Sequence, residues 1–255
     1  MPKPSLVLIP GTLCDARMFA RQARALRLQA RVQYVSYQHL DWQGDWAAQL
    51  LKALPERFAL AGFSLGGLVA LELLRRAPER IERLALIASN AEPAGSTAQR
   101  RSALLHRLWL ASGARAVSRQ SKPAYFHHAA RRQQHAALLF DMALQTSRCA
   151  ALGEFAWAAT RPSGYDALAA FKGPVLIASG AQDRLCPPAL QQRMAAAQPK
   201  AHWCEIKRCG HFVPLEAPGR LNDVLRFWLN EPVYPRLRDH IESTVTSHPT
   251  YQSAG

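Results

Sequence analysis

The sequence predicts an α/β fold, in which a mostly parallel sheet of about six strands carries helices on both faces. Short apolar runs alternate with amphipathic stretches over residues 1–90 and again over residues 171–230. Strands that alternate with helices along a chain are typical of a parallel sheet covered on both sides. With 255 residues, 49% of them apolar, the chain is long enough to bury the core of one such domain.

Each expected strand is a short apolar run bounded by polar or turn-forming residues. The six runs span residues 5–10, 31–37, 57–62, 81–88, 174–179 and 202–206. Apolar residues at helical spacing predict the helices between them. These helices span about 16–28, 45–54, 65–76, 187–197 and 217–229. Because ligands of parallel sheets bind beyond the carboxyl ends of the strands, the loops that follow the strands are the expected site of function.

Residues 91–170 interrupt this alternation. Their apolar residues recur at helical spacing with no strand between them, which predicts a helical insertion. Residues 1–90 and 171–230 then form the core of the domain. The stretch 231–255 is polar and lacks periodicity, so we expect a loosely attached tail there.

One strand ends in the sequence Gly62-Phe-Ser-Leu-Gly66, with Ser64 at its centre. In the pattern Gly-x-Ser-x-Gly the serine occupies a strained turn from strand to helix, and the glycines allow close backbone approach. The turn exposes the hydroxyl and directs the first amides of the following helix, beginning with Leu65, at any negative charge that forms beside it. A glycine-rich turn with an incidental serine has the same pattern, so a reactive serine needs partners elsewhere in the chain.

Two such partners follow the fifth and sixth strands. Asp183 lies in the turn Gly-Ala-Gln-Asp, and His211 lies in the loop Cys-Gly-His-Phe. A lone aspartate after a strand is commonly a turn former, but serine, aspartate and histidine in this order, each at the end of a strand, are typical of one class of serine hydrolase. Glu92, which follows the fourth strand, is a competing acid, and Glu216 is expected to pair locally.

Over residues 5–230 the sequence resembles the α/β-hydrolase superfamily, in particular its small lidded serine carboxylesterases. The motifs that carry the resemblance are GFSLGG around Ser64, GAQDRLCPP around Asp183 and GHFVPLEAP around His211. Two features depart from the superfamily. The antiparallel strands that usually open the fold are not expected before the first strand, and the loop Pro10-Gly-Thr-Leu13 lacks the histidine that many relatives carry there.

The resemblance implies cleavage of carboxylic esters of small to medium acyl chains, without a cofactor or a metal. His211 would take the proton of Ser64 as the serine attacks the acyl carbonyl, while Asp183 orients the imidazole. By similarity to the family, the backbone amides of Thr12 and Leu65 would hold the oxyanion. Enol-lactone hydrolysis, carbon–carbon bond hydrolysis and perhydrolysis use the same three residues, and the fold also serves as a non-catalytic ligand-binding scaffold, so these alternatives stay open.

The insertion is expected to form a lid, whose apolar side chains line part of an acyl pocket. The residues expected in this pocket are Leu13, which is also the second choice as oxyanion donor, and Trp109, Phe126, Phe140 and Trp157. Packing within the lid core is the alternative for most of them.

The formal net charge of +14 indicates acidic partners as a class, although no motif supports nucleic-acid binding. Some carboxylesterases of the superfamily cleave a methyl ester from an acyl chain on acyl carrier protein, an acidic partner, and use a basic lid to hold it. The side chains that would serve this contact are Arg100, Arg101, Arg107, Arg115, Arg119, Arg131 and Arg132. A solvated basic face is the plain alternative.

The sequence also bears on location and on thiol chemistry. No apolar run is long enough to span a membrane, and the start of the chain lacks the features of a signal peptide. Five cysteines at irregular spacing match neither a disulfide framework nor a zinc site. We therefore expect a cytoplasmic protein with free thiols. Cys14, Cys186 and Cys209 lie in loops at the expected site, either as small buried residues or as thiols whose modification blocks activity.

Overall fold

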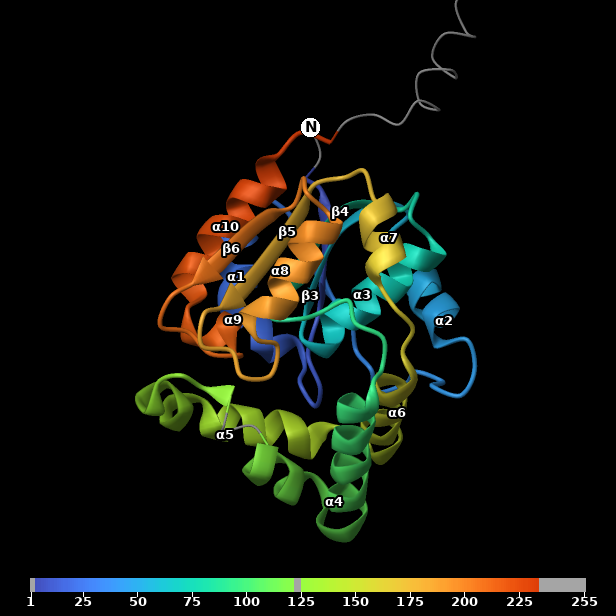
Figure 1. Cartoon of the computed structure of the whole chain (residues 1–255), viewed down its shortest axis with the longest axis vertical. Helices are drawn as coiled ribbons and strands as arrows, with labels where there is room; N and C mark the ends of the chain where they lie inside the picture. The colour runs from blue at the N-terminus through green and yellow to red at the C-terminus, as the bar shows by residue number, and fades with distance from the viewer. Residues whose placement is uncertain (1–2, 122–124, 234–255) are drawn as a thin grey trace, which may run out of the picture.

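The computed structural model describes residues 3–121 and 125–233, without the side chains of 118–121. Its centre is a sheet of six strands in the order β2-β1-β3-β4-β5-β6 (Figure 1). The strands are β1 (Ser5–Ile9), β2 (Arg31–Tyr34), β3 (Phe58–Phe63), β4 (Ile81–Ile87), β5 (Val175–Gly180) and β6 (His202–Ile206). Every neighbouring pair is parallel, which confirms the predicted α/β fold with about six strands.

Helices follow the strands much as the apolar spacing predicts. Those of the core are η1 (Ala16–Phe19, a 3-10 helix), α1 (Ala20–Leu26), α2 (Trp46–Ala53), α3 (Leu65–Arg76), α8 (Pro188–Ala197), α9 (Val213–Glu216) and α10 (Pro218–Asn230). Between β4 and β5 the chain forms α4 (Ser96–Ser121), α5 (Ala129–Gln145), α6 (Arg148–Thr160) and α7 (Tyr165–Ala170). The single helix expected over 16–28 is therefore divided into η1 and α1.

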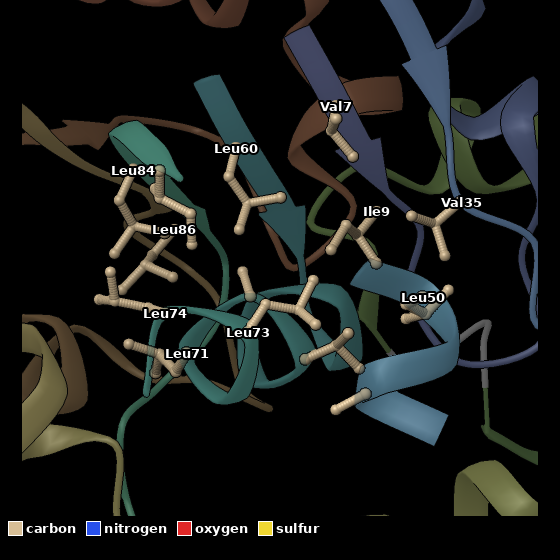
Figure 2. Packing of buried hydrophobic residues seen from close by; sticks show 14 of the residues in the cluster. Val7, Ile9, Val35, Leu50, Leu60, Leu71, Leu73, Leu74, Leu84 and Leu86 are labelled. Carbon is tan, nitrogen blue, oxygen red and sulfur yellow. The ribbon is translucent and has the colours of Figure 1, made fainter. Parts of the chain in front are cut away.

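The sheet is buried on both faces, because successive side chains of a strand point to opposite sides. Val7 and Ile9 of β1 pack with α2, α3, α7 and α8, and Figure 2 shows them with leucines of α2, α3 and neighbouring strands. Leu6 and Leu8 of the same strand pack on the other face with α1, α9 and α10. This two-sided burial explains why the strands read as nearly continuous apolar runs.

Helices α4, α5 and α6 gather at one end of the sheet (Figure 1). They surround a small apolar cluster of their own, which includes Leu105, Trp109 and Phe155 and reaches Leu13 in the loop after β1. Helix α7 behaves differently, because its Leu168 packs into the core beside α3 and α8. The part of residues 91–170 that stands apart from the sheet therefore ends before α7.

The far end of α10 is fastened to the sheet. Arg83 of β4 donates from Nη1 to the carbonyls of Trp228 and Glu231, at 2.8 and 2.6 Å. The tail expected over 231–255 lies outside the described residues from position 234 onward. Within the described part of the chain, no helix has the length and apolar character that crossing a bilayer requires.

Candidate active site

Ser64 lies in the turn between β3 and α3, near the middle of the sheet, with φ 54° and ψ −116°. A positive φ is strained for a residue with a side chain, so the surroundings must hold it. Ser64 N donates to the carbonyl of Ile87 (2.9 Å), and Ser89 Oγ donates to the carbonyl of Ser64 (2.8 Å). The strained turn that the motif predicts is therefore fixed by the adjacent strand β4 and the residues that follow it.

The glycines of the motif are needed for close backbone packing. A Cβ built on Gly62 would collide with the backbone of Gly66, and one built on Gly66 would collide with the carbonyls of Ile9 and Pro10. The first turn of α3 thus lies against β1 and β3 at a distance that only glycine allows. This contact places the start of the helix, with its free amides, directly beside Ser64.

The structure brings Ser64, Asp183 and His211 together. His211 Nε2 lies 2.9 Å from Ser64 Oγ, and His211 Nδ1 lies 2.8 Å from Asp183 Oδ2. His211 and Asp183 are 2% and 3% exposed, so this pairing is shielded from water. The other carboxylate oxygen of Asp183 accepts hydrogen bonds from the amides of Leu185 (2.8 Å) and Cys186 (2.9 Å), which fix its orientation.

The loop that carries His211 is tied to the segment before α5. His211 N donates to the carbonyl of Tyr125 (2.8 Å), whose ring packs edge-on against the imidazole. Glu216 accepts from Gly210 N (3.1 Å), a local contact as predicted, and also from His127 N (2.8 Å), which is 89 residues away in the chain. Burial raises the pKa of the Glu216 carboxyl, while these backbone donors favour its charged form.

The amides expected to hold an oxyanion differ in their availability. Within the described residues, the amides of Thr12 and Leu65 donate to no protein acceptor, and both residues line the cavity that contains Ser64. Leu13 N, by contrast, donates to Glu154 Oε2 at 2.8 Å. The amide of Leu13, the second choice as oxyanion donor, is therefore already hydrogen-bonded to Glu154. The amides of Thr12 and Leu65 remain available to an oxyanion.

Glu154 is the site residue that sequence reasoning missed. It lies in α6 and is 1% exposed, yet its carboxylate reaches the loop after β1 and lines the cavity beside Ser64. The neighbouring Gly153 lets α6 pack closely against the ring of Trp42, because a Cβ at position 153 would collide with that ring. A signal was present, since Glu154 is the only charged residue between Arg148 and Arg161 in an apolar helix.

Two cavities meet at Ser64. The smaller, of about 40 Å³, is also lined by His211 and Phe212, and the larger, of about 550 Å³, extends beneath α4 and α6. The residues common to both linings are Thr12, Ser64, Arg101, Leu105 and Leu185. A substrate bound at Ser64 thus has a narrow space on the histidine side and a wide one on the other.

Of the five residues expected to line an acyl pocket, only Leu13 lines either of these cavities. Trp109 packs on Phe155, and Phe126 stacks on Phe212. Phe140 lies beneath Arg115, and Trp157 packs edge-on against Trp46. The large apolar rings of these four residues pack between elements in the structure, and smaller side chains such as Leu105 and Leu185 line the cavity beside the serine. A role for the four rings in binding an acyl chain stays a prediction.

The competing acid Glu92 and the cysteines near the site are engaged in other contacts or buried. Glu92 accepts from Tyr165 Oη and Arg193 Nε, both at 2.7 Å, whereas Asp183 is the carboxylate bonded to His211. Burial raises the pKa of the Cys186 thiol to about 12, so it is protonated at neutral pH.

Cys14 and Cys209 are buried as well. Among the described residues, the one trio with metal-ligand spacing is Asp183, Cys186 and His211. Two of its members are already hydrogen-bonded to each other, and the third is a protonated thiol.

The comparisons with known proteins place the fold in a family. Residues 6–224 match the alpha/beta hydrolase family. A curated relative, the pimeloyl-[acyl-carrier protein] methyl ester esterase of Aromatoleum aromaticum, is 32% identical over 187 residues, which cover 68% of this chain and 74% of the relative.

Solved structures share the fold at lower identity. A thermophilic esterase from Thermogutta terrifontis is 22% identical with a TM-score of 0.77, over 89% of this chain and 90% of that one. The enol-lactonase from Burkholderia xenovorans LB400 has the same identity and TM-score, over 91% and 93%. Because the family model matches most of its length, the chain belongs to the alpha/beta hydrolase family.

Proposed function

We propose that this protein is a serine hydrolase that cleaves carboxylic esters through an acyl-enzyme on Ser64. The observation that carries the proposal is the row of hydrogen bonds from Ser64 Oγ through His211 to the buried carboxylate of Asp183, at 2.9 and 2.8 Å. A serine hydroxyl becomes a nucleophile when a base within hydrogen-bond distance takes its proton and a third group orients that base.

The proposed reaction has two halves. In the first, His211 Nε2 takes the proton of Ser64 as its oxygen attacks the ester carbonyl, and the amides of Thr12 and Leu65 donate to the resulting oxyanion. The carbon–oxygen bond to the alcohol then breaks, and His211 returns the proton to the departing oxygen. In the second half, water attacks the acyl-enzyme by the same route, which releases the acid and regenerates Ser64.

The two cavities suggest which part of the ester lies where. The departing alcohol must be near His211, because that residue gives it a proton. The cavity that His211 lines is the small one, of about 40 Å³, whereas the cavity of about 550 Å³ opens from Ser64 on the other side. We therefore infer a substrate with a small alcohol, such as a methyl ester, and a considerably larger acyl group.

A methyl ester carried on acyl carrier protein is the finer candidate. The curated relative from Aromatoleum aromaticum bears the name of such an esterase. Arg100, Arg107 and Arg132 of α4 and α5 are exposed, and within the described residues none of them has a carboxylate partner. Exposed cations of this kind would attract an acidic carrier. Arg119 belongs to the same expected set, but its side chain lies outside the described residues.

The experiment that tests the proposal compares the parent protein with Ser64→Ala on methyl and p-nitrophenyl esters from acetate to octanoate. We expect the substitution to lower kcat by a factor on the order of 10⁶ while the circular-dichroism spectrum and Tm stay unchanged. A fluorophosphonate, which labels activated serines, should modify the parent at Ser64 and leave the variant unmodified.

Labelling without ester turnover would leave the reactive serine in place but point to another reaction of the same residues, such as lactone or carbon–carbon bond hydrolysis. Absence of both labelling and turnover in a folded protein would overturn the proposal, and tight ligand binding would then favour a non-catalytic scaffold.

A further inference from the structure

The larger cavity beside Ser64 is lined by charged as well as apolar side chains. Five of them carry a charge: Arg101, Arg161, Arg193, Glu92 and Glu154. Glu154 is buried, whereas Glu92, Arg101 and Arg161 are partly exposed and Arg193 is exposed. A pocket that serves only hydrocarbon chains has no need of charged side chains in its lining, since these are costly to remove from water when the ligand binds. A charged side chain of the lining that has no partner of opposite charge within the protein therefore indicates the charge of the ligand.

Both glutamates are already engaged by the protein. Glu92 accepts from Tyr165 Oη and from Arg193 Nε, each at 2.7 Å, and these hydrogen bonds, chiefly that from Tyr165, lower the pKa of its carboxyl. Glu154 accepts from Leu13 N. One arginine, Arg193, is thus matched by one carboxylate, and two arginines are left to account for.

Arg101 is held in place without an anionic partner. Its guanidinium lies over the ring of Tyr125, 5.1 Å from the ring centroid, and the side chain is half-buried. Among the described residues no carboxylate forms an ion pair with it. A guanidinium that stacks on an aromatic face keeps the N–H groups at its edge free to donate to a ligand.

The place of Arg101 within the site is equally specific. It lines the small cavity and the large one, together with Ser64, so it stands where they join. Arg101 stacks on the ring of Tyr125, and the carbonyl of Tyr125 accepts the hydrogen bond of His211 N. Tyr125 therefore links Arg101 to the loop that carries His211.

Arg161 adds a second positive charge to the large cavity. It donates from Nε to the carbonyl of Glu92 and from Nη1 to that of Ala158. Burial lowers the pKa of this guanidinium, although it stays protonated at neutral pH because its ordinary value is so high. Its hydrogen bonds are to neutral carbonyls, and the nearby Glu92 carboxylate, which also pairs with Arg193, offsets only part of its charge. The remaining positive charge adds to that of Arg101 in attracting an anion.

We propose that Arg101 binds an anionic group, a carboxylate or a phosphate, on the acyl part of the substrate. The inference rests on the proposed ester hydrolysis and narrows its substrate class: the ester has a small alcohol at one end, and its acyl chain carries a negative charge. Arg101 is thereby moved from the set of surface arginines expected to meet a carrier protein to the substrate cavity. Its planar guanidinium suits either anion, because both offer paired oxygens.

The test uses pairs of methyl esters that have equal chain length and differ only in charge. Monomethyl esters of glutaric, adipic and pimelic acids are compared with methyl alkanoates, and a third set ends in an amide of O-phosphoethanolamine. The proteins are the parent, Arg101→Gln, Arg101→Lys and Arg115→Gln. Arg115 is the matched control, because it lies in the part of α4 that follows the kink at Gly113 and also stacks on an aromatic ring, that of Phe140, but lines neither cavity.

We expect the parent to prefer charged esters, and Arg101→Gln to lower the ratio of kcat/KM for charged over neutral esters by roughly 10- to 100-fold, mainly through KM. Arg101→Lys should restore part of that ratio, and Arg115→Gln should leave it unchanged. A preference for the dicarboxylate set identifies a carboxylate, and one for the phosphate-ended set identifies a phosphate.

Two results would overturn the inference and leave the proposed function standing: no preference for charged esters in a parent that hydrolyses neutral ones, or equal losses in Arg101→Gln and Arg115→Gln. If no ester of any set is cleaved and Ser64 is not labelled by a fluorophosphonate, the proposed function itself fails. The two failures are therefore distinguishable.

Discussion

At the scale of single residues, Leu13 and Glu154 decide the form of the loop that faces Ser64. Leu13 has a φ of 52°, a conformation that a leucine does not adopt without support. Its amide donates to a carboxylate that is 1% exposed, 141 residues away in the chain. Because Thr12 is the preceding residue, this bond also fixes the amide proposed to hold the oxyanion. We regard Glu154 as a positioning residue that acts through the loop.

This role predicts different outcomes for two substitutions of Glu154. Glu154→Gln keeps an oxygen acceptor for Leu13 N, so kcat should fall by less than about tenfold. Glu154→Leu leaves the buried amide without its acceptor, which should cost about 1–3 kcal/mol of stability and lower kcat by up to about 10²-fold with little change in KM. Steady-state kinetics and thermal unfolding check both effects. Equal kcat values for the two variants would contradict the positioning role.

At the scale of elements, the first turn of α3 packs closely against the sheet beside the site. Its backbone lies against the ends of β1 and β3, where a Cβ on Gly66 would meet the carbonyls of Ile9 and Pro10. Backbone atoms cannot move aside as a flexible side chain can. Any residue larger than glycine must therefore push the helix away from the sheet and displace Ser64.

Gly66→Ala should consequently destabilise the fold by about 3 kcal/mol or more, or lower Tm by roughly 6–12 °C, with loss of activity. Gly219→Ala is the matched control, because nothing lies within 4 Å of a Cβ built there at the start of α10. That change should stabilise the fold by about 0.5 kcal/mol by restricting the unfolded chain. Differential scanning calorimetry measures both, and a Gly66→Ala protein as stable as the parent would contradict the packing argument.

At the scale of the whole molecule, positive charge is in large excess. The chain carries 32 Lys and Arg against 18 Asp and Glu. Most of this charge does not contribute to stability, because exposed ion pairs are weak and like charges repel. A field of one sign does accelerate encounter with a partner of opposite sign, and salt screens it. An acidic carrier protein and a small ester should therefore respond differently to ionic strength.

We expect kcat/KM for a methyl ester linked to acyl carrier protein to fall roughly tenfold between 50 and 500 mM NaCl. For methyl octanoate, which is neutral and has a small alcohol, the change should stay within about twofold. Stopped-flow or discontinuous product assays at each salt concentration provide the comparison. A carrier-linked ester whose turnover is insensitive to salt would remove the carrier from the proposed function.

Much of the architecture could be predicted because its determinants are local. The apolar runs of β1, β3 and β4 follow from burial on both faces of a parallel sheet, and Gly62 and Gly66 mark the turn at Ser64. Predicted boundaries are less accurate where a helix changes type, as at η1 and α1, because both types share the same short apolar spacing.

The lining of the cavity could not be predicted in the same way. Trp109 in α4 and Phe155 in α6 each belong to a set of apolar residues at helical spacing. That spacing is the same whether the apolar face of the helix meets another helix or a ligand. The structure uses Trp109 for packing between α4 and α6 and turns Leu105 and Arg101 toward Ser64. The rotation of a helix about its axis depends on all its neighbours, so no single segment of sequence fixes it.

The sequence by itself determined the fold class, the turn at Ser64 and the candidates Asp183 and His211, since each depends on residues close together in the chain or on the order of strands. Only the tertiary structure decided that Leu13 N belongs to Glu154, that Glu92 belongs to Arg193, and that Arg101 faces the cavity. The physical reason is that these pairings join groups up to 141 residues apart. For Leu13 N and Glu154, which are both 1% exposed, burial makes the hydrogen bond obligatory, because a buried polar group must find a partner wherever the fold brings one.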